Sequence, residues 1–339
     1  MDLFLRIAGI LALVVVLGLA ALVAFFWWHW RRIKRTLGAG LPPLEIALVP
    51  DTAPEWTGRA PFAAVIADFQ SLGFAPVGPF EVEGLAGMHL LGFCHRGTGV
   101  FGGCFNHPAT GCFVDVCATL ADGLELTVTN APAGGEMDTR PGTEKVFLAG
   151  RPLAELHAAL LEKIAGRPVQ PCPPERFQDE FVAAYARDMA WRTNRLGVSE
   201  AEFRRVAANG KNPCSEAQLA AAFRETKLQE LRQWAAAAEE EFARTGSLSV
   251  ARWQQFEDAR LVYRHDFHPA AYLEYVAESV ELPDATKAAL QAELDSGSPL
   301  DGLLDKVAAA TGRRFVPLGS VERPVRCTLY GIESAPAAR

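Results

Sequence analysis

The sequence predicts an α+β protein: a single N-terminal transmembrane helix, then an antiparallel β-meander packed with helices, and then a mainly α-helical domain. The transmembrane helix is indicated by residues 7–30, which contain no Asp, Glu, Lys or Arg. In residues 74–130 apolar side chains alternate with others and glycine-containing turns recur at short intervals, as is typical of antiparallel hairpins. After residue 175 the apolar side chains recur at helical spacing.

The apolar segment 7–30 is long enough to cross a membrane. Its 24 residues would extend about 36 Å as a helix, against a hydrocarbon core of about 30 Å. One basic residue, Arg6, precedes it, whereas four basic residues follow it within 31–35. Because basic residues concentrate on the cytoplasmic side, we expect a single-pass protein of the bacterial inner (plasma) membrane, with its N-terminus outside and its soluble part cytoplasmic.

A cleaved signal peptide is the alternative interpretation of this segment. Its apolar region would span about 7–15 residues and end at a small-residue cleavage site. Here the segment ends in Trp27, Trp28 and Trp30, which favours a retained anchor with aromatic rings at the membrane interface. The seven cysteines, an odd number without a CxxC pair, indicate free thiols and a reducing compartment.

The net charge of the chain limits the classes of partner that it can bind. The chain has a formal net charge of −7, and residues 1–35 contribute a net +4, so the remainder carries about −11. An acidic surface of this kind argues against nucleic acid as a partner. We expect the lipid bilayer as the partner of residues 7–30, a protein partner at the membrane, and no cofactor.

Changes in composition and periodicity predict the domain boundaries. The expected order is an anchor with its basic flank (1–35), a spacer (36–43), an α+β domain with an antiparallel sheet (44–166), a Pro-rich linker (167–174), a helical domain (175–312) and a partly extended C-terminal segment (313–339).

Turn chemistry predicts the register of the meander. Gly97 and Thr98 suit a two-residue type II′ turn, residues 108–111 a four-residue turn, and residues 121–123 a three-residue loop with Gly123 in the left-handed region. The predicted cross-strand pairs are Cys94 with Phe101, Phe105 with Val114, and Leu120 with Leu124.

This register assigns the side chains to two faces of the sheet. The core face would hold Met88, Leu90, Cys94, Phe101, Phe105, Val114, Val116, Leu120, Leu124, Leu126 and Val128. The second face would hold His89, Leu91, Phe93, Val100, Cys104, Phe113, Asp115 and Cys117. Because the second set is too apolar for a solvated surface, we expect a helix, a partner or a ligand to cover part of it.

Capping residues and apolar spacing predict the downstream helices. These helices are 175–196, one opened by Ser199 with Glu202, one opened by Ser215 with Gln218 and continuing to about Thr245, and then 252–265, 269–280, 284–294 and 299–310. The first should dock on the α+β domain, and the apolar stripe of the long one should be core. Residues 315–318 and 325–330 are short strands or an extended tail.

A cluster of cysteines and histidines between residues 94 and 117 raises the question of a zinc site. Cys104 and His107 are three residues apart, and Cys112 and Cys117 are five apart, so each pair would point to opposite faces of a regular strand. We therefore interpret the cysteines as small core residues and expect no metal.

The same register suggests a nucleophile on the second face. Asp115 would lie across from Cys104, with His89 diagonally on the next strand. A thiol, an imidazole and a carboxylate are the groups of an activated-cysteine site, so Cys104, His89 and Asp115 are the candidate catalytic residues.

Other catalytic motifs are missing from the sequence. It contains no GxSxG, P-loop, HExxH or dinucleotide fingerprint. The leading hypothesis is a membrane-anchored, non-catalytic interaction or scaffold module. The alternative is a cysteine- or metal-dependent enzyme, or a small-ligand sensor, that uses the second face of the sheet.

Overall fold

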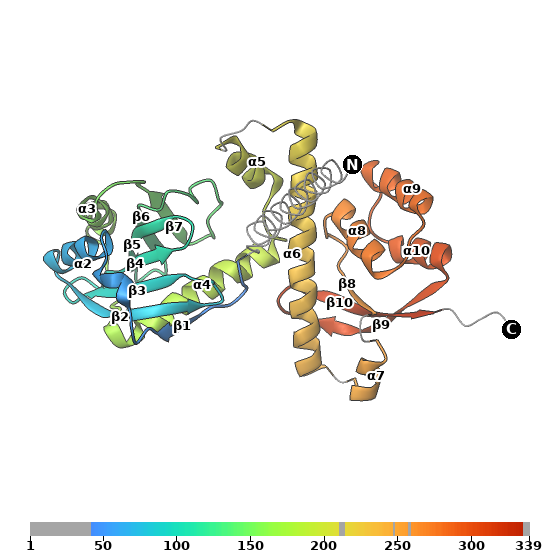
Figure 1. Cartoon of the computed structure of the whole chain (residues 1–339), viewed down its shortest axis with the longest axis horizontal. Coiled ribbons are helices and arrows are strands. Elements are labelled where there is room, and N and C mark those ends of the chain that lie inside the picture. The colour runs from blue at the N-terminus through green and yellow to red at the C-terminus, as the bar shows by residue number, and fades with distance from the viewer. Residues whose placement is uncertain (1–41, 210–213, 247, 257–258, 335–339) are drawn as a thin grey trace, which may run out of the picture. The chain divides into compact units, whose positions relative to one another are not determined.

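A computed structural model describes residues 42–334 apart from 210–213, 247 and 257–258 (Figure 1). Within them, one sheet of seven strands and one of three are combined with helices, which confirms the α+β class. In chain order the elements are β1 (Ala47–Pro50), the 3-10 helix η1 (Glu55–Gly58), α2 (Phe62–Ser71), β2 (Phe74–Glu83), β3 (His89–His95), β4 (Phe101–His107), β5 (Gly111–Thr119), β6 (Glu125–Thr129), β7 (Thr143–Phe147), α3 (Leu153–Ile164), η2 (Pro174–Arg176), α4 (Phe177–Asn194), α5 (Glu200–Ala208), α6 (Glu216–Thr245), α7 (Val250–Gln254), β8 (Arg260–Tyr263), α8 (Pro269–Ser279), α9 (Asp284–Asp295), α10 (Leu303–Thr311), β9 (Arg313–Val321) and β10 (Cys327–Ser334).

The predicted membrane span 7–30 lies outside the described residues. Among the residues that are described, none of the helices combines the length and the apolar character that crossing a bilayer requires.

The large sheet is a meander in the order β1-β2-β3-β4-β5-β6-β7, antiparallel except for the parallel β6–β7 pair. Helices α2 and α3 cover one face of it, where Phe69, Leu156 and Leu160 are fully buried against β-strand residues such as Phe93 and Val116. Phe69 also explains why a glycine stands in β4: a Cβ at Gly102 would lie 2.8 Å from its ring. Because Gly102 has no side chain, α2 can lie close to the sheet at this point.

Helix α4 covers the opposite face of the same sheet (Figure 1). Phe177, at its start, is buried with Phe80, Leu90 and Phe105 of the sheet. A Cβ at Gly92 would lie 2.4 Å from the Phe177 ring, so the helix approaches the backbone of β3 directly. Hydrogen bonds from Gln178 and Tyr185 also hold α4, which confirms the prediction that the first downstream helix docks on the α+β domain.

The predicted register is confirmed at two of its three turns. Cys94 pairs with Phe101, and the Leu120 amide donates to the Leu124 carbonyl (2.9 Å) with Gly123 at φ +87°. Gly123 has the left-handed conformation that the last turn requires. At the first turn the left-handed residue is Gly99 (φ +73°) and not Gly97, so the predicted type II′ turn is wrong although its register is right.

The middle turn differs from the prediction by one residue. Phe105 pairs with Phe113 instead of Val114, and His107 pairs with Gly111. The reason is a side-chain contact: His107 Nδ1 accepts hydrogen bonds from the amides of Ala109 (3.1 Å) and Thr110 (3.2 Å) and so shapes a loop of three residues. A shift of one residue sends every side chain of β5 to the face opposite the predicted one.

The C-terminal part combines helices with a second sheet in the order β8-β10-β9. The predicted stripe of α6 is core, because Leu231, Trp234 and Phe242 are buried there. The predicted helix 252–265 is wrong: it is divided into α7 and β8, because β8 pairs with the distant β10. Likewise the helix predicted at 299–310 begins only after Gly302, whose left-handed conformation (φ +80°) interrupts helical geometry.

Candidate functional site

The three residues predicted as a catalytic set do not share one face. Cys104 and His89 lie on the face under α2 and α3, close to Val114 and Trp56 respectively. Asp115 lies opposite Gly103 and, next to Val114 in the strand, points to the other face. The expected juxtaposition of all three groups is therefore wrong, and its cause is the one-residue shift at the His107 turn.

His89 has a different carboxylate partner. Its Nδ1 lies 3.5 Å from Oδ2 of Asp51, which also accepts a hydrogen bond from Trp56 Nε1 (3.2 Å). Asp51 follows β1, which is separated from β3 by β2 in the sheet, so no local pattern in the sequence relates it to His89. Cys104 instead has its sulfur 3.9 Å from that of Cys112. These two pairs are not the nucleophile–base arrangement that thiol catalysis requires.

Asp115 is an acid on the face covered by α4. Its Oδ1 is closed off from solvent and has no hydrogen-bond partner among the described residues. Burial raises the pKa of Asp115 to about 6, although Thr129 and Lys145 act in the opposite direction. Burial also raises the pKa of the neighbouring Cys117 to about 12, so this thiol is neutral at physiological pH.

The described residues contain no group of three or more His, Cys, Asp and Glu side chains that could hold a metal ion. The zinc interpretation of residues 94–117 consequently has no geometric support within that part of the chain. Cys104 and Cys112 are two potential ligands, whereas structural zinc sites almost always have four.

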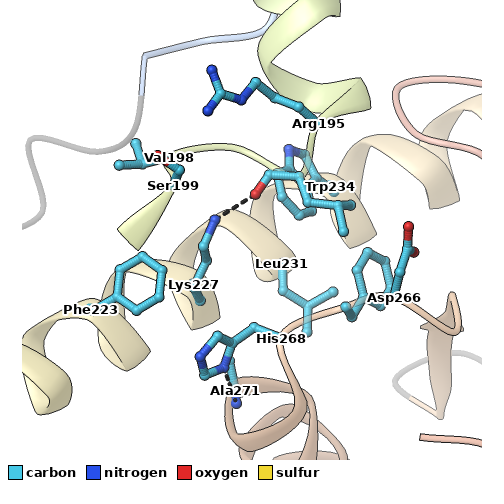
Figure 2. Close-up of a pocket in the computed structure, with 12 residues that line it drawn as sticks. Arg195, Val198, Ser199, Phe223, Lys227, Leu231, Trp234, Asp266, His268 and Ala271 are labelled. Atoms are coloured by element: carbon cyan, nitrogen blue, oxygen red, sulfur yellow. Dashed lines mark hydrogen bonds between the residues drawn. The ribbon is translucent and has the colours of Figure 1, made fainter. Parts of the chain in front are cut away.

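A pocket of about 200 Å³ lies where α6 meets the connection between α4 and α5 and the start of α8 (Figure 2). We call it the α6 pocket. Its lining residues are Arg195, Leu196, Val198, Ser199, Phe223, Lys227, Leu231, Trp234, Asp266, Phe267, His268 and Ala271. Aromatic and aliphatic side chains predominate among them, and the polar groups come from all three segments.

The wall of the α6 pocket formed by residues 195–199 is fixed by a tight helix end. Leu196 (φ +62°) and Gly197 (φ +75°) both adopt left-handed conformations, and the Gly197 amide donates to the Arg192 carbonyl (2.7 Å). A Cβ at Gly197 would lie 2.1 Å from Oε1 of Glu230, so only glycine fits. Two residues later Ser199 opens α5 with the predicted capping box.

A buried ion pair binds this wall to α6. Lys227 Nζ donates to the Leu196 carbonyl and to Glu230 Oε2 (2.8 Å), and the Val198 amide donates to Glu230 Oε1 (2.8 Å). Figure 2 shows the Lys227 side chain rising from α6 toward this loop. Burial raises the pKa of Glu230, with Lys227 opposing the shift. The pair thus holds the loop in position, and Lys227 is also a charged part of the pocket lining.

His268 contributes a neutral imidazole to the α6 pocket. Its Nδ1 accepts a hydrogen bond from the Ala271 amide (3.3 Å) and caps α8. Burial lowers the pKa of His268, and the nearby Lys227 lowers it further. Since Nδ1 is the acceptor, the proton of the neutral ring is assigned to Nε2, which leaves one hydrogen-bond donor.

The α6 pocket is not predicted by any sequence motif, although the sequence contains one signal of it. Lys227 precedes Leu231 by four residues and Trp234 by seven, so it lies on the apolar stripe of α6. A lysine at such a position needs a buried partner. The partner, Glu230, is three residues away on the same helix, but the loop that both residues bind is found only in the structure.

Comparison with known proteins gave no match to a protein-family model, a curated protein or a solved structure.

Proposed function

We propose that this chain is a non-catalytic interaction module, anchored by residues 7–30 in the bacterial inner membrane with residues 36–339 in the cytoplasm. One observation supports this proposal most directly: the chain's own helices cover both faces of the large sheet. The enzyme and sensor alternatives required an accessible second face. Helices α2 and α3 cover the face that holds His89 and Cys104, and α4 fills the opposite face with Phe177 and Phe181, which favours the interaction hypothesis.

The size of the α6 pocket supports a protein partner over a small-molecule ligand. Pockets for drug-sized ligands typically occupy roughly 300–1,000 Å³, whereas this one measures about 200 Å³. Such a volume suits one side chain of a partner, and buried anchor side chains contribute much of the binding energy at protein interfaces. The walls formed by Phe223, Leu231 and Trp234 favour an apolar anchor.

The polar residues that line the α6 pocket would orient the partner's apolar side chain. Lys227 and the Nε2–H group of His268 are donors, so the backbone carbonyls or a carboxylate next to the anchor side chain are suitable acceptors. Tethering by residues 7–30 would raise the local concentration of the pocket near membrane partners. The membrane segment 7–30 and the α6 pocket thus have complementary roles: the first keeps the chain near membrane partners, and the second binds one of them.

Site-specific photo-crosslinking in intact membranes tests the proposal. A photoreactive phenylalanine analogue replaces Phe223, which lines the pocket and is half-buried. The matched control carries the same analogue in place of Phe315 of β9, another half-buried phenylalanine. We expect a discrete protein adduct from position 223 alone, and a weaker one when residues 1–35 are deleted.

Two outcomes would contradict the proposal. Equal adducts from positions 223 and 315 would show that the pocket has no particular role. Saturable binding of a small metabolite at position 223, without a protein adduct, would favour the sensor alternative.

A further inference from the structure

Two cysteines on adjacent strands lie close together under α2 and α3. Cys104 is opposite Val114 and Cys112 is opposite Asn106, so the two thiols are diagonal neighbours across the β4–β5 pair. Their sulfur atoms are 3.9 Å apart. This proximity is independent of the α6 pocket and of the interaction proposed for it.

The two thiols differ in environment. Cys104 is fully buried, whereas Cys112, two residues after the loop that follows His107, is half-buried. The hydrogen bond from the Cys104 thiol lowers the pKa of Cys112, and the same bond together with burial raises the pKa of Cys104. Cys112 is therefore the more accessible and the more readily ionised sulfur of the pair.

We propose that Cys104 and Cys112 form an oxidisable dithiol whose co-reactant is a peroxide, and that oxidation closes a disulfide between β4 and β5. The Cys112 thiolate attacks one peroxide oxygen, the O–O bond breaks, and the sulfur becomes a sulfenic acid while hydroxide leaves and takes up a proton as water. The Cys104 sulfur then attacks the Cys112 sulfur, its thiol proton is lost, and the sulfenic oxygen leaves as a second water. In total two thiols and one hydrogen peroxide give one disulfide and two waters.

Closure requires movement of both the sulfur atoms and the backbone. A disulfide bond is about 2.05 Å long, so the sulfur atoms must approach by about 1.9 Å from their present separation. Diagonal neighbours on antiparallel strands are roughly 7–8 Å apart, beyond the usual Cα separation of a disulfide, so the end of β5 at Cys112 must also shift toward β4. In a reducing cytosol, thiol–disulfide exchange would restore the two thiols, which makes the modification reversible.

A second close pair provides an internal comparison. Cys94 and Cys172 share a hydrogen bond on the face covered by α4, and both are buried. Because a peroxide reaches neither sulfur as readily as Cys112, this pair should oxidise more slowly. The Cys104–Cys112 pair should therefore oxidise before the Cys94–Cys172 pair.

Peptide mapping of the full-length chain tests the assignment. The chain is treated in detergent with hydrogen peroxide, its remaining thiols are alkylated, and its peptides are analysed without reduction. We expect a linked peptide pair joining Cys104 to Cys112, two hydrogen atoms lighter than the separate peptides, before any Cys94–Cys172 link and reversed by dithiothreitol. A first link between Cys94 and Cys172, or unchanged Cys104 and Cys112 thiols after the exposed Cys214 has reacted, would overturn it.

A matched pair of variants tests the order of the two steps. With Cys104→Ala the sulfenic acid on Cys112 has no neighbouring thiol, so a dimedone adduct should accumulate there. With Cys112→Ala the buried Cys104 should remain unmodified. Dimedone labelling of Cys104 in preference to Cys112 would contradict the assigned roles, and the wild-type mapping decides the disulfide itself even if a variant fails to fold.

Discussion

Replacement of Asp115 by asparagine should stabilise the protein at neutral pH. Asp115 lies on the sheet face that α4 covers, and its Oδ1 is closed off from solvent without a partner among the described residues. Burial raises its pKa to about 6 from an ordinary value of 3.8, so the folded state holds the proton more tightly than the unfolded state does. Ionisation of Asp115 above this range therefore opposes folding.

The size of the effect follows from the pKa difference. At 1.36 kcal/mol for each pKa unit, the shift of Asp115 corresponds to about 3 kcal/mol at pH 7 and to about half as much at pH 5. Well below pH 3.8 the carboxyl is protonated in both states and the penalty vanishes. Asp115→Asn removes the titration and retains a side chain of the same shape, so it should gain up to about 3 kcal/mol at pH 7.

Urea unfolding of residues 36–339 between pH 4 and 7 measures this difference. The free energy of unfolding of wild type is subtracted from that of Asp115→Asn at each pH, which cancels the titration of all other groups. We expect the difference to grow as the pH rises from about 4 to 6 and then to level off. A difference that is independent of pH, or a variant less stable than wild type at pH 7, would show that α4 does not close over this carboxyl.

Three further sets of substitutions test other parts of the structure by the same unfolding assay. Phe177→Ala should cost about 3–5 kcal/mol because it leaves a cavity between α4 and the sheet, whereas Leu161→Ala, on the exposed side of α3, should cost about 0.5 kcal/mol or less; equal costs would contradict the α4 packing. Glu230→Leu leaves Lys227 buried without its carboxylate and should cost about 3–5 kcal/mol, most of it recovered by adding Lys227→Met; additive losses would contradict the pairing. Burial lowers the pKa of His157, so wild type should lose stability as the pH falls below about 6.5, and His157→Gln should reduce this loss; parallel pH profiles would count against a buried neutral imidazole.

Local sequence signals predicted those features whose geometry is determined locally. The capping boxes at Ser199 and Ser215 are both present, because each needs only residues within one helical turn. The loop ending at Gly123 was predictable for the same reason: a left-handed position follows from the residue that occupies it. The buried stripe of α6 likewise follows from spacing alone.

The incorrect predictions concern features that depend on contacts which residue type and spacing do not encode. The His107 imidazole accepts hydrogen bonds from the amides of its own turn, and this single side chain changed the register by one residue. That shift placed Asp115 on the face opposite Cys104 and removed the predicted catalytic set. Strand β8 was misassigned because its pairing partner, β10, lies more than sixty residues downstream.

The candidate site was less predictable than the fold. The α6 pocket is assembled from three segments that only the tertiary structure brings together, and its Lys227–Glu230 pair binds a loop whose position depends on Gly197. The sequence does mark Lys227 as unusual on an apolar stripe. It does not contain the information that Leu196 supplies the acceptor.

Protease protection of the full-length chain in spheroplasts tests the central claim, that residues 36–339 are a tethered module on the cytoplasmic side of the membrane. Protease added outside should leave residues 36–339 intact, and should degrade them only after the membrane is opened with detergent. Digestion of residues 36–339 from the outside alone would contradict the orientation, the reducing compartment and the proposed access to cytoplasmic partners together.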